Sequence, residues 1–144
     1  MYYYYSRNQQ QAVDELIKQM KGAIDGEYSA VKCYEKLARM APNDQERERI
    51  LEIRNDEIKH FTELVKLYSG IFGRDPKPEL IEECPDEYEL GLEAAIIDEQ
   101  NTVDKYLTIA DHAANTAVKQ FFTRAAKDEQ NHAVWFLYLW IKNK

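Results

Sequence analysis

The residues best suited to chemistry in this sequence form a Glu-x-x-His pattern that occurs twice, at Glu57 and His60 and again at Glu129 and His132. Residues three apart share one face of a helix, so each pair can present a carboxylate and an imidazole to the same ion. One such pair is a weak signal in a chain rich in Glu. Two pairs are a specific pattern, and they predict metal binding.

The two pairs belong to an internal repeat with an offset of 72 residues (99 − 27), which needs no gap. By this offset Glu27 corresponds to Glu99, and each lies among apolar neighbours typical of an inward helix face. Each supplies one more carboxylate. The predicted metal ligands are therefore Glu27, Glu57, His60, Glu99, Glu129 and His132.

The charge of this set favours two ions over one. Four carboxylates carry four negative charges and neutral imidazoles add none, so two divalent cations neutralise the cluster. Without metal, carboxylates gathered in a core repel one another and lose solvation, or they take up protons. Iron and manganese both accept carboxylate and imidazole ligands, so the pattern is compatible with either metal.

Apolar residues recur at intervals of three and four along most of the chain, which predicts an all-α protein. Asn43 is the predicted cap of the second helix, and Asn115 or Thr116 of the fourth. The predicted helices span residues 8–40, 43–69, 86–113 and 116–141.

Residues 71–85 lack this periodicity and contain three prolines, so they are predicted to be a linker. When extended, the linker spans up to roughly 50 Å, whereas a helix of about 28 residues is roughly 40 Å long. It can therefore cross the whole bundle. We expect one domain over residues 1–144, a ferritin-like four-helix bundle of two antiparallel hairpins joined by one long crossover.

On these residues the sequence resembles the ferritin-like di-iron carboxylate proteins, and most closely the di-iron domain of rubrerythrins. The resemblance covers nearly all of the chain. It includes both Glu-x-x-His pairs and a Gly-Glu-x-x-Ala-x-x-x-Tyr-x-x-x-Ala pattern formed by Gly26, Glu27, Ala30, Tyr34 and Ala38.

The resemblance implies a role for each residue. Glu57 and Glu129 would bridge two irons, Glu27 and Glu99 would be terminal or semi-bridging ligands, and each His would bind one iron. Asp56 and Asp128, four residues before each His, would orient the imidazoles. Tyr34 and Tyr106 lie two turns after Glu27 and Glu99, where they are either core aromatics or donors to a metal-bound carboxylate.

The implied function is that of a di-iron oxidoreductase with no catalytic residue beyond the metal ligands, in oxidative stress or iron handling. Peroxide or dioxygen would oxidise Fe(II). A rubredoxin-like iron site needs four cysteines and the chain has two, so the electron donor would be a separate protein. Rubrerythrins usually carry a seventh ligand, a Glu, three residues after the position of Glu99. Thr102 stands there, which predicts a more symmetric site and leaves peroxide reactivity open.

Two other functions fit the same ligands. One is a metal-binding structural protein whose site is filled but not turned over, for example a spore-coat component. The other is an iron-storing cage, which the short chain and the lack of a fifth predicted helix disfavour.

Composition excludes several partners. A net charge of −7 without a Lys/Arg cluster argues against nucleic acid. No apolar segment approaches membrane-spanning length and no secretory signal is evident, so we expect a cytoplasmic protein, with spore association as the alternative. Cys33 and Cys84 are accordingly expected to be free thiols.

Three remaining features have simpler interpretations. His112 is expected to be a helix-end residue that complements the helix dipole. Residues 135–140 are apolar all round, which predicts an oligomer interface and a homodimer, with a swapped dimer left open. Residues 2–5, four tyrosines, are interpreted as a tail without function, with partner binding as the alternative.

Overall fold

The computed structural model describes residues 2–144, with side chains from Arg7 onward. Within that part the chain forms four α-helices and no strand, which confirms the predicted all-α class. The prediction for the tyrosines at 2–5 concerns side chains outside the described residues. The helices are α1 (Tyr2–Met40), α2 (Asp44–Phe72), α3 (Tyr88–His112) and α4 (Thr116–Lys142).

Polar caps and one glycine set the helix ends. The side chain of Asn43 accepts a hydrogen bond from the Glu46 amide at 2.9 Å, as the sequence predicts. Asn115 is the cap of α4, because its side chain accepts from the Val118 amide at 3.1 Å. Helix α2 continues past the predicted end at residue 69 to Gly73, whose φ of 69° is left-handed and terminates the helix.

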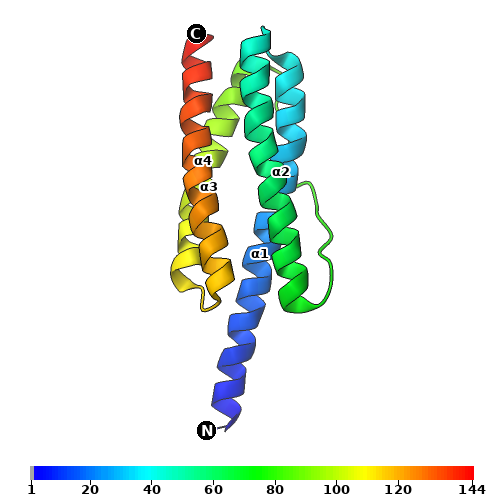
Figure 1. Ribbon diagram of the computed structural model, residues 1–144, viewed down its shortest axis with the longest axis vertical. Helices are drawn as coiled ribbons and strands as arrows, with labels where there is room; N and C mark the ends of the chain where they lie inside the picture. The colour runs from blue at the N-terminus through cyan, green and yellow to red at the C-terminus, as the bar shows by residue number, and fades with distance from the viewer. Residues whose placement is uncertain (1) are drawn as a thin grey trace.

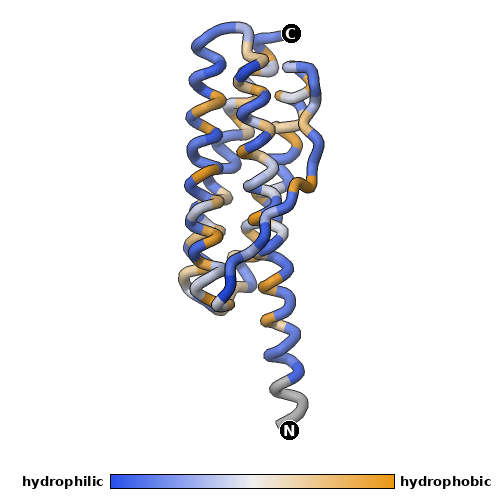
Figure 2. Tube along the Cα trace, turned by 90° about the vertical axis from the view of Figure 1, so that its right-hand side faces the viewer, coloured by the Kyte–Doolittle hydropathy of each residue, from blue (hydrophilic) through white to orange (hydrophobic). Residues whose placement is uncertain are grey.

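The two hairpins, α1 with α2 and α3 with α4, lie side by side as one bundle (Figure 1). Helix α1 has 39 residues whereas the others have 25 to 29, and its N-terminal part projects beyond the bundle (Figure 2). It begins at Tyr2 rather than at the predicted residue 8. Gln9 to Ala12 are good helix formers, so the helix continues without an apolar face to signal it.

The apolar core consists of two separate clusters. One contains Met20, Leu64 and Phe122, and the other contains Leu37 and Phe136. All five are fully buried. On every helix the predicted ligands lie between residues of the two clusters, so a polar layer is enclosed by apolar layers on both sides.

The connection between the hairpins, residues 73–87, is held against α1. The Glu79 amide donates to Asp25 Oδ1 at 2.9 Å, and the Ile81 amide donates to Ser29 Oγ at 3.0 Å. One turn further along α1, Cys33 forms a disulfide with Cys84.

The expectation of free thiols was therefore wrong. Asp25, Ser29 and Cys33 follow one another at intervals of four on a single face of α1, and the connection runs along that face. It brings the two cysteine Cα atoms to 5.2 Å, within the usual disulfide range. The sequence does not reveal this path.

Among the described residues, no helix is long and apolar enough to span a membrane.

The disulfide should stabilise the protein substantially, because it closes a loop across 51 positions of sequence. We expect the Cys33→Ser/Cys84→Ser variant to lose about 2 to 4 kcal/mol of unfolding free energy in guanidinium titrations. Wild type treated with reductant should match the variant, and reductant should leave the variant unchanged. Equal stability of oxidised and reduced wild type would contradict the expectation.

Candidate metal centre

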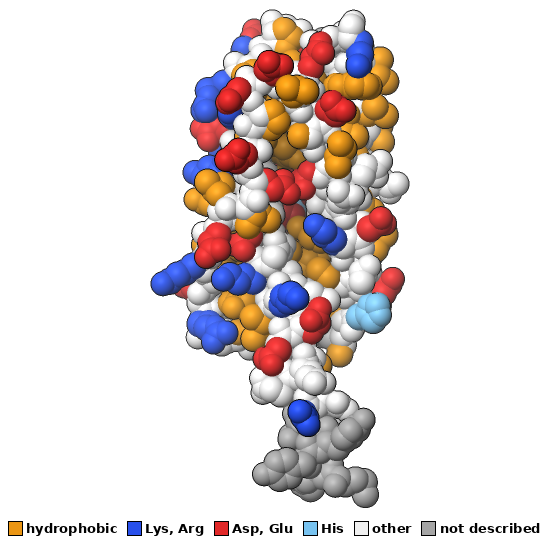
Figure 3. All heavy atoms as spheres, turned by 180° about the vertical axis from the view of Figure 1, so that it is seen from behind, with side chains coloured by type: hydrophobic (Ala, Val, Ile, Leu, Met, Phe, Trp, Pro, Cys, Tyr) orange, Lys and Arg blue, Asp and Glu red, His pale blue; other side chains and the backbone are white. Residues whose placement is uncertain are grey.

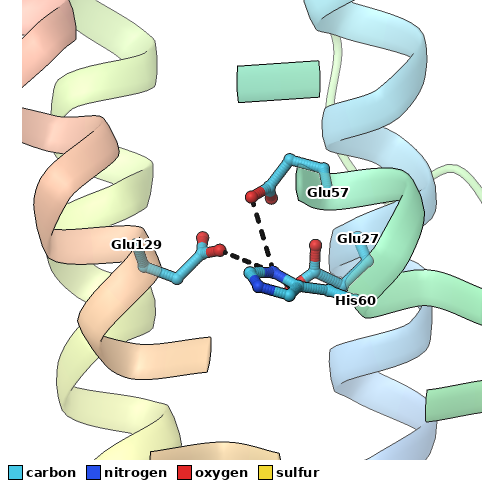
Figure 4. A group of neighbouring side chains, drawn as sticks. All are labelled: Glu27, Glu57, His60 and Glu129. Carbon is cyan, nitrogen blue, oxygen red and sulfur yellow. Dashed lines mark ion pairs between the residues drawn. The ribbon is translucent and has the colours of Figure 1, made fainter. Parts of the chain in front are cut away.

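All six predicted ligands converge at mid-height in the bundle. Helix α1 supplies Glu27, α3 supplies Glu99, and α2 and α4 each supply one Glu-x-x-His pair. Each of the six residues is between 1% and 5% exposed. Figure 4 shows Glu27, Glu57, His60 and Glu129 pointing toward one another from three helices.

The potential ligand atoms form two overlapping groups. Within each group, one atom from every residue lies within 4.8 Å of the others. Glu57 and Glu129 belong to both groups, whereas each imidazole belongs to one. This is the arrangement that two neighbouring ions with two bridging carboxylates require. The groups are Glu27, Glu57, His60 and Glu129, and Glu57, Glu99, Glu129 and His132.

Unsatisfied polar atoms test whether the residues fit a metal pair. Each of the six residues has one buried side-chain atom that makes no regular hydrogen bond among the described residues, although His60 Nδ1 lies 3.1 Å from Glu129 Oε1 and His132 Nδ1 lies 3.0 Å from Glu57 Oε1, at ion-pair distance. Such atoms are costly and rare, and six of them at one place call for a common partner. Carboxylate oxygens and imidazole nitrogens are a donor set suited to iron or manganese, so the residues fit. The atoms are Glu27 Oε2, Glu57 Oε1, His60 Nδ1, Glu99 Oε2, Glu129 Oε1 and His132 Nδ1.

The outer nitrogen of each imidazole is fixed by an aspartate from the other hairpin. His60 Nε2 lies 2.8 Å from Asp128 Oδ2, and His132 Nε2 lies 2.8 Å from Asp56 Oδ2. Both aspartates are those that the resemblance identified, but each contacts the histidine of the opposite helix. The imidazoles point at the bundle axis, so their outer nitrogens reach the facing helix rather than one turn back along their own. Nδ1 of each ring therefore faces the centre.

The two tyrosines show the same crossed pairing. Tyr34 donates to Glu99 Oε1 and Tyr106 donates to Glu27 Oε1, both at 2.5 Å. Both tyrosines also belong to the apolar clusters, so each is a core aromatic that donates to a carboxylate of the candidate site. Burial, followed by the nearby carboxylates, raises the pKa of both tyrosines well above the usual value, so both remain protonated donors.

Comparisons with known proteins agree with this geometry. A rubrerythrin profile matches residues 91–143, the hairpin that carries Glu99, Glu129 and His132. The uncharacterized protein YhjR of Bacillus subtilis is 54% identical over 123 residues, which cover 85% of each chain. The chain belongs to the rubrerythrin family.

Two solved structures share the fold of this rubrerythrin-family chain. A hypothetical protein from Pyrococcus furiosus has a TM-score of 0.72 at 22% identity, over 85% of each chain. The conserved hypothetical protein rv2844 from Mycobacterium tuberculosis has a TM-score of 0.75 at 11% identity, over 85% of this chain and 88% of its own. At such identities the likeness supports the fold alone.

Without metal, the rubrerythrin-type cluster retains protons. Burial, and then the neighbouring carboxylates, raises the pKa of Glu57 and Glu129 well above the usual value. Burial lowers the pKa of His60 and His132, but facing carboxylates such as Glu27 and Glu57 outweigh it. The pKa values become about 10 and about 11. A metal ion that binds here must displace these protons.

Other singled-out positions take ordinary roles. Thr102 donates its hydroxyl to the Asp98 carbonyl at 2.8 Å, so it adds no ligand. His112 is exposed at the end of α3, as predicted, with Nδ1 2.9 Å from the Thr108 carbonyl. Residues 135–140 do not form one continuous exposed surface, since Phe136 is fully buried while Leu137 is 42% exposed.

Sequence reasoning missed a second class of site residues, the small ones. Gly22, Gly26 and Ala30 follow at intervals of four on α1 and line a cavity that reaches Glu27. Sequence reasoning used Gly26 and Ala30 only as part of the family pattern. The signal that was available is the pair of glycines inside a long helix, where glycine is otherwise disfavoured.

The proton retention has a measurable consequence for the metal-free protein. A group whose pKa is raised by folding stabilises the fold fully below its unfolded pKa, and this contribution is lost as the pH rises toward the folded value. Glu57, Glu129 and both histidines all shift in this direction. In urea titrations we expect the free energy of unfolding to fall between pH 7 and pH 9, by about 1.4 kcal/mol per pH unit for each of these groups that keeps its proton only in the folded state.

The matched variant is Glu57→Gln/Glu129→Gln, which removes two of the titrating groups and should flatten the slope. Excess metal should abolish or reverse the dependence, because metal binding requires deprotonated ligands. If metal-free wild type shows the same dependence of unfolding free energy on pH as this variant, the assignment of buried, protonated carboxylates is wrong.

The crossed aspartates predict an effect on metal affinity. Replacing Asp56 or Asp128 by Asn removes the negative charge that orients an imidazole, and we expect metal affinity to fall by about 10-fold to 100-fold. Competition with a chromophoric chelator measures the change. The exposed Asp111→Asn on α3 is the control and should match wild type. Equal affinity in all four proteins would show that these hydrogen bonds do not support metal binding.

Proposed function

We propose that this protein is a di-iron oxidoreductase of the rubrerythrin type. Peroxide or dioxygen would oxidise two Fe(II) ions held by the six residues, and a separate donor protein would return the electrons. The observation that carries the proposal is the set of six unsatisfied, buried ligand atoms, one on each predicted ligand. Family membership supports iron as the metal, and manganese is the alternative with the same ligand preferences.

The residues of the chain would divide the work. Glu57 and Glu129 would hold both ions, and Glu27 and Glu99 would complete one group each. The bound metals would supply the electrons for reducing the oxidant. Because Tyr106 holds one oxygen of Glu27, the other oxygen stays directed at the centre.

The surroundings would keep the site rigid and shield it from water on two sides. The Asp128 to His60 and Asp56 to His132 hydrogen bonds fix both rings, so neither ring needs to reorient when an ion binds. The apolar clusters around Leu64 and Leu37 exclude bulk water on two sides. Such preorganisation costs no rearrangement during reaction.

The alternative is a metal-binding structural protein, for example at a spore surface, and one observation favours it. The Cys33–Cys84 disulfide is a type of bond that is rare in a reducing cytoplasm and persists in oxidising surroundings. A structural protein would bind the same metals without fast turnover.

We also propose that the protein is a homodimer. Val134, Leu137 and Ile141 are spaced along one side of α4 and are 42% to 61% exposed. This exposed apolar stripe supports an interface on α4.

The deciding experiment compares metal content and oxidation rate. We expect wild type purified without chelator to hold about two metal ions per chain, and Glu57→Ala/Glu129→Ala to hold none, because the bridging carboxylates serve both ions. The exposed Glu48→Ala/Glu93→Ala variant controls for loss of negative charge. Stopped-flow absorbance then follows the Fe(II) form after peroxide or dioxygen is added.

Fast oxidation with two ions bound supports the oxidoreductase. Bound metal without oxidation favours the structural protein instead. Absence of metal from wild type after loading with Fe(II) or Mn(II) would refute the site itself.

A further inference from the structure

A cavity of about 550 Å³ lies between α1 and α3 and reaches the metal centre. Its inner wall is formed by three of the site carboxylates, those of Glu27, Glu57 and Glu129. Figure 3 looks onto this side of the molecule, where a hollow at mid-height is bordered by charged and apolar side chains. The centre can therefore be approached through the gap between these two helices.

The cavity breaks the internal symmetry of the bundle. Beyond the site, toward the C-terminal end of α1, the helices touch so closely that a Cβ on Gly91 would lie 2.6 Å from Leu37 Cδ1. The residues related to this pair by the repeat offset are Gln19 and Ile109, and both line the cavity instead. The helices are thus in contact on one side of the site and separated on the other.

Small residues keep the space open. A Cβ added to Gly22 or Gly26 would meet no other described atom within 4 Å, so packing does not require glycine at either position. Glycine inside a helix lowers helix stability relative to alanine. With no side chain, both glycines add to the open volume of the cavity that they line.

The walls between the mouth and the site are largely apolar. Ala23, Ala30 and Ile109 line the passage, and the connection between the hairpins adds Ile81. Ile81 is held in place because its amide donates to Ser29 Oγ, three residues before the Cys33–Cys84 disulfide. Exposed lysines lie near the surface and carboxylates lie at the centre, and the polar side chains of Glu82, Asp98 and Thr102 also line the cavity.

We propose that this cavity admits an organic hydroperoxide, ROOH, with R an alkyl or aryl group in the apolar passage and the peroxide group at the carboxylates. The inference rests on the proposed oxidoreductase function and names its substrate class. A volume of about 550 Å³ is in the range of small-molecule pockets. The cavity is far larger than hydrogen peroxide needs. Hydrogen peroxide is little larger than a water molecule, which occupies about 30 Å³ in the liquid.

The reaction balances as ROOH + 2 Fe(II) + 2 H⁺ → ROH + H₂O + 2 Fe(III). The O–O bond breaks as it accepts two electrons, one from each ferrous ion. One oxygen leaves as the alcohol and the other as water, and solvent supplies both protons. The separate one-electron donor then restores the ferrous state.

The test fills the cavity without disturbing the fold. Gly26→Leu places a side chain in the passage, and Gly70→Leu is the control, since Gly70 also lies in a helix with open space around a Cβ. Stopped-flow absorbance compares oxidation of the Fe(II) form by cumene hydroperoxide and by hydrogen peroxide. We expect Gly26→Leu to slow oxidation by cumene hydroperoxide about tenfold or more and oxidation by hydrogen peroxide less than about threefold. Gly70→Leu should change neither rate.

Binding provides a second measurement that needs no iron. Cumyl alcohol, the product of cumene hydroperoxide, should bind the metal-free wild type and Gly70→Leu in ligand-observed NMR, but not Gly26→Leu. Thermal unfolding checks that both variants fold.

The outcomes separate the inference from the function on which it rests. If neither peroxide nor dioxygen oxidises the Fe(II) form, the proposed function fails, and cumyl alcohol binding alone then decides whether the cavity takes apolar ligands. If hydrogen peroxide reacts while cumene hydroperoxide does not, the substrate class is wrong. The same conclusion follows if Gly26→Leu slows both oxidants equally.

Discussion

Burial of four carboxylates in the centre of a small helical bundle is the constraint on which the rest of the structure depends. The four are at most 3% exposed, and apolar layers lie on both sides of them. Such a layer opposes folding unless each oxygen has a proton, a donor or a metal. Tyr34 and Tyr106 satisfy one oxygen of Glu99 and Glu27, and the remaining atoms point at a common centre. The polar layer is thus divided between hydrogen bonds on its outside and candidate metal ligands on its inside.

The same hydrogen bonds join the two hairpins. Each tyrosine and each aspartate belongs to one hairpin, whereas its partner belongs to the other. Separating the hairpins would break two buried pairs, two partly buried pairs and the site as well. Apolar contacts join the hairpins as well, since each of the two core clusters contains residues of both hairpins. The two similar halves therefore form one unit through polar and apolar contacts together.

Much of the fold and of the candidate site could be predicted from the sequence, because both depend on the local spacing of residues. Helical periodicity predicts four helices, the Asn43 cap follows from its Glu46 partner, and the offset of 72 selects the six converging residues from a chain rich in Glu. Features that depend on the three-dimensional path were not accessible. Pairing of Cys33 with Cys84 requires knowing that the connection runs along α1. Similarly, the exchange of Asp56 and Asp128 between hairpins requires knowing which helices face each other.

The internal repeat conceals a functional asymmetry. The ligands repeat without change, so the two halves of the centre receive the same donors. Positions around the ligands do not repeat: Gly26 and Ala30 on α1 correspond to Asp98 and Thr102 on α3. All four border the cavity, but the α1 positions leave space whereas the α3 positions carry polar side chains. A repeated set of candidate ligands can thus present the same donors from both hairpins, while the residues around it leave space on one side only.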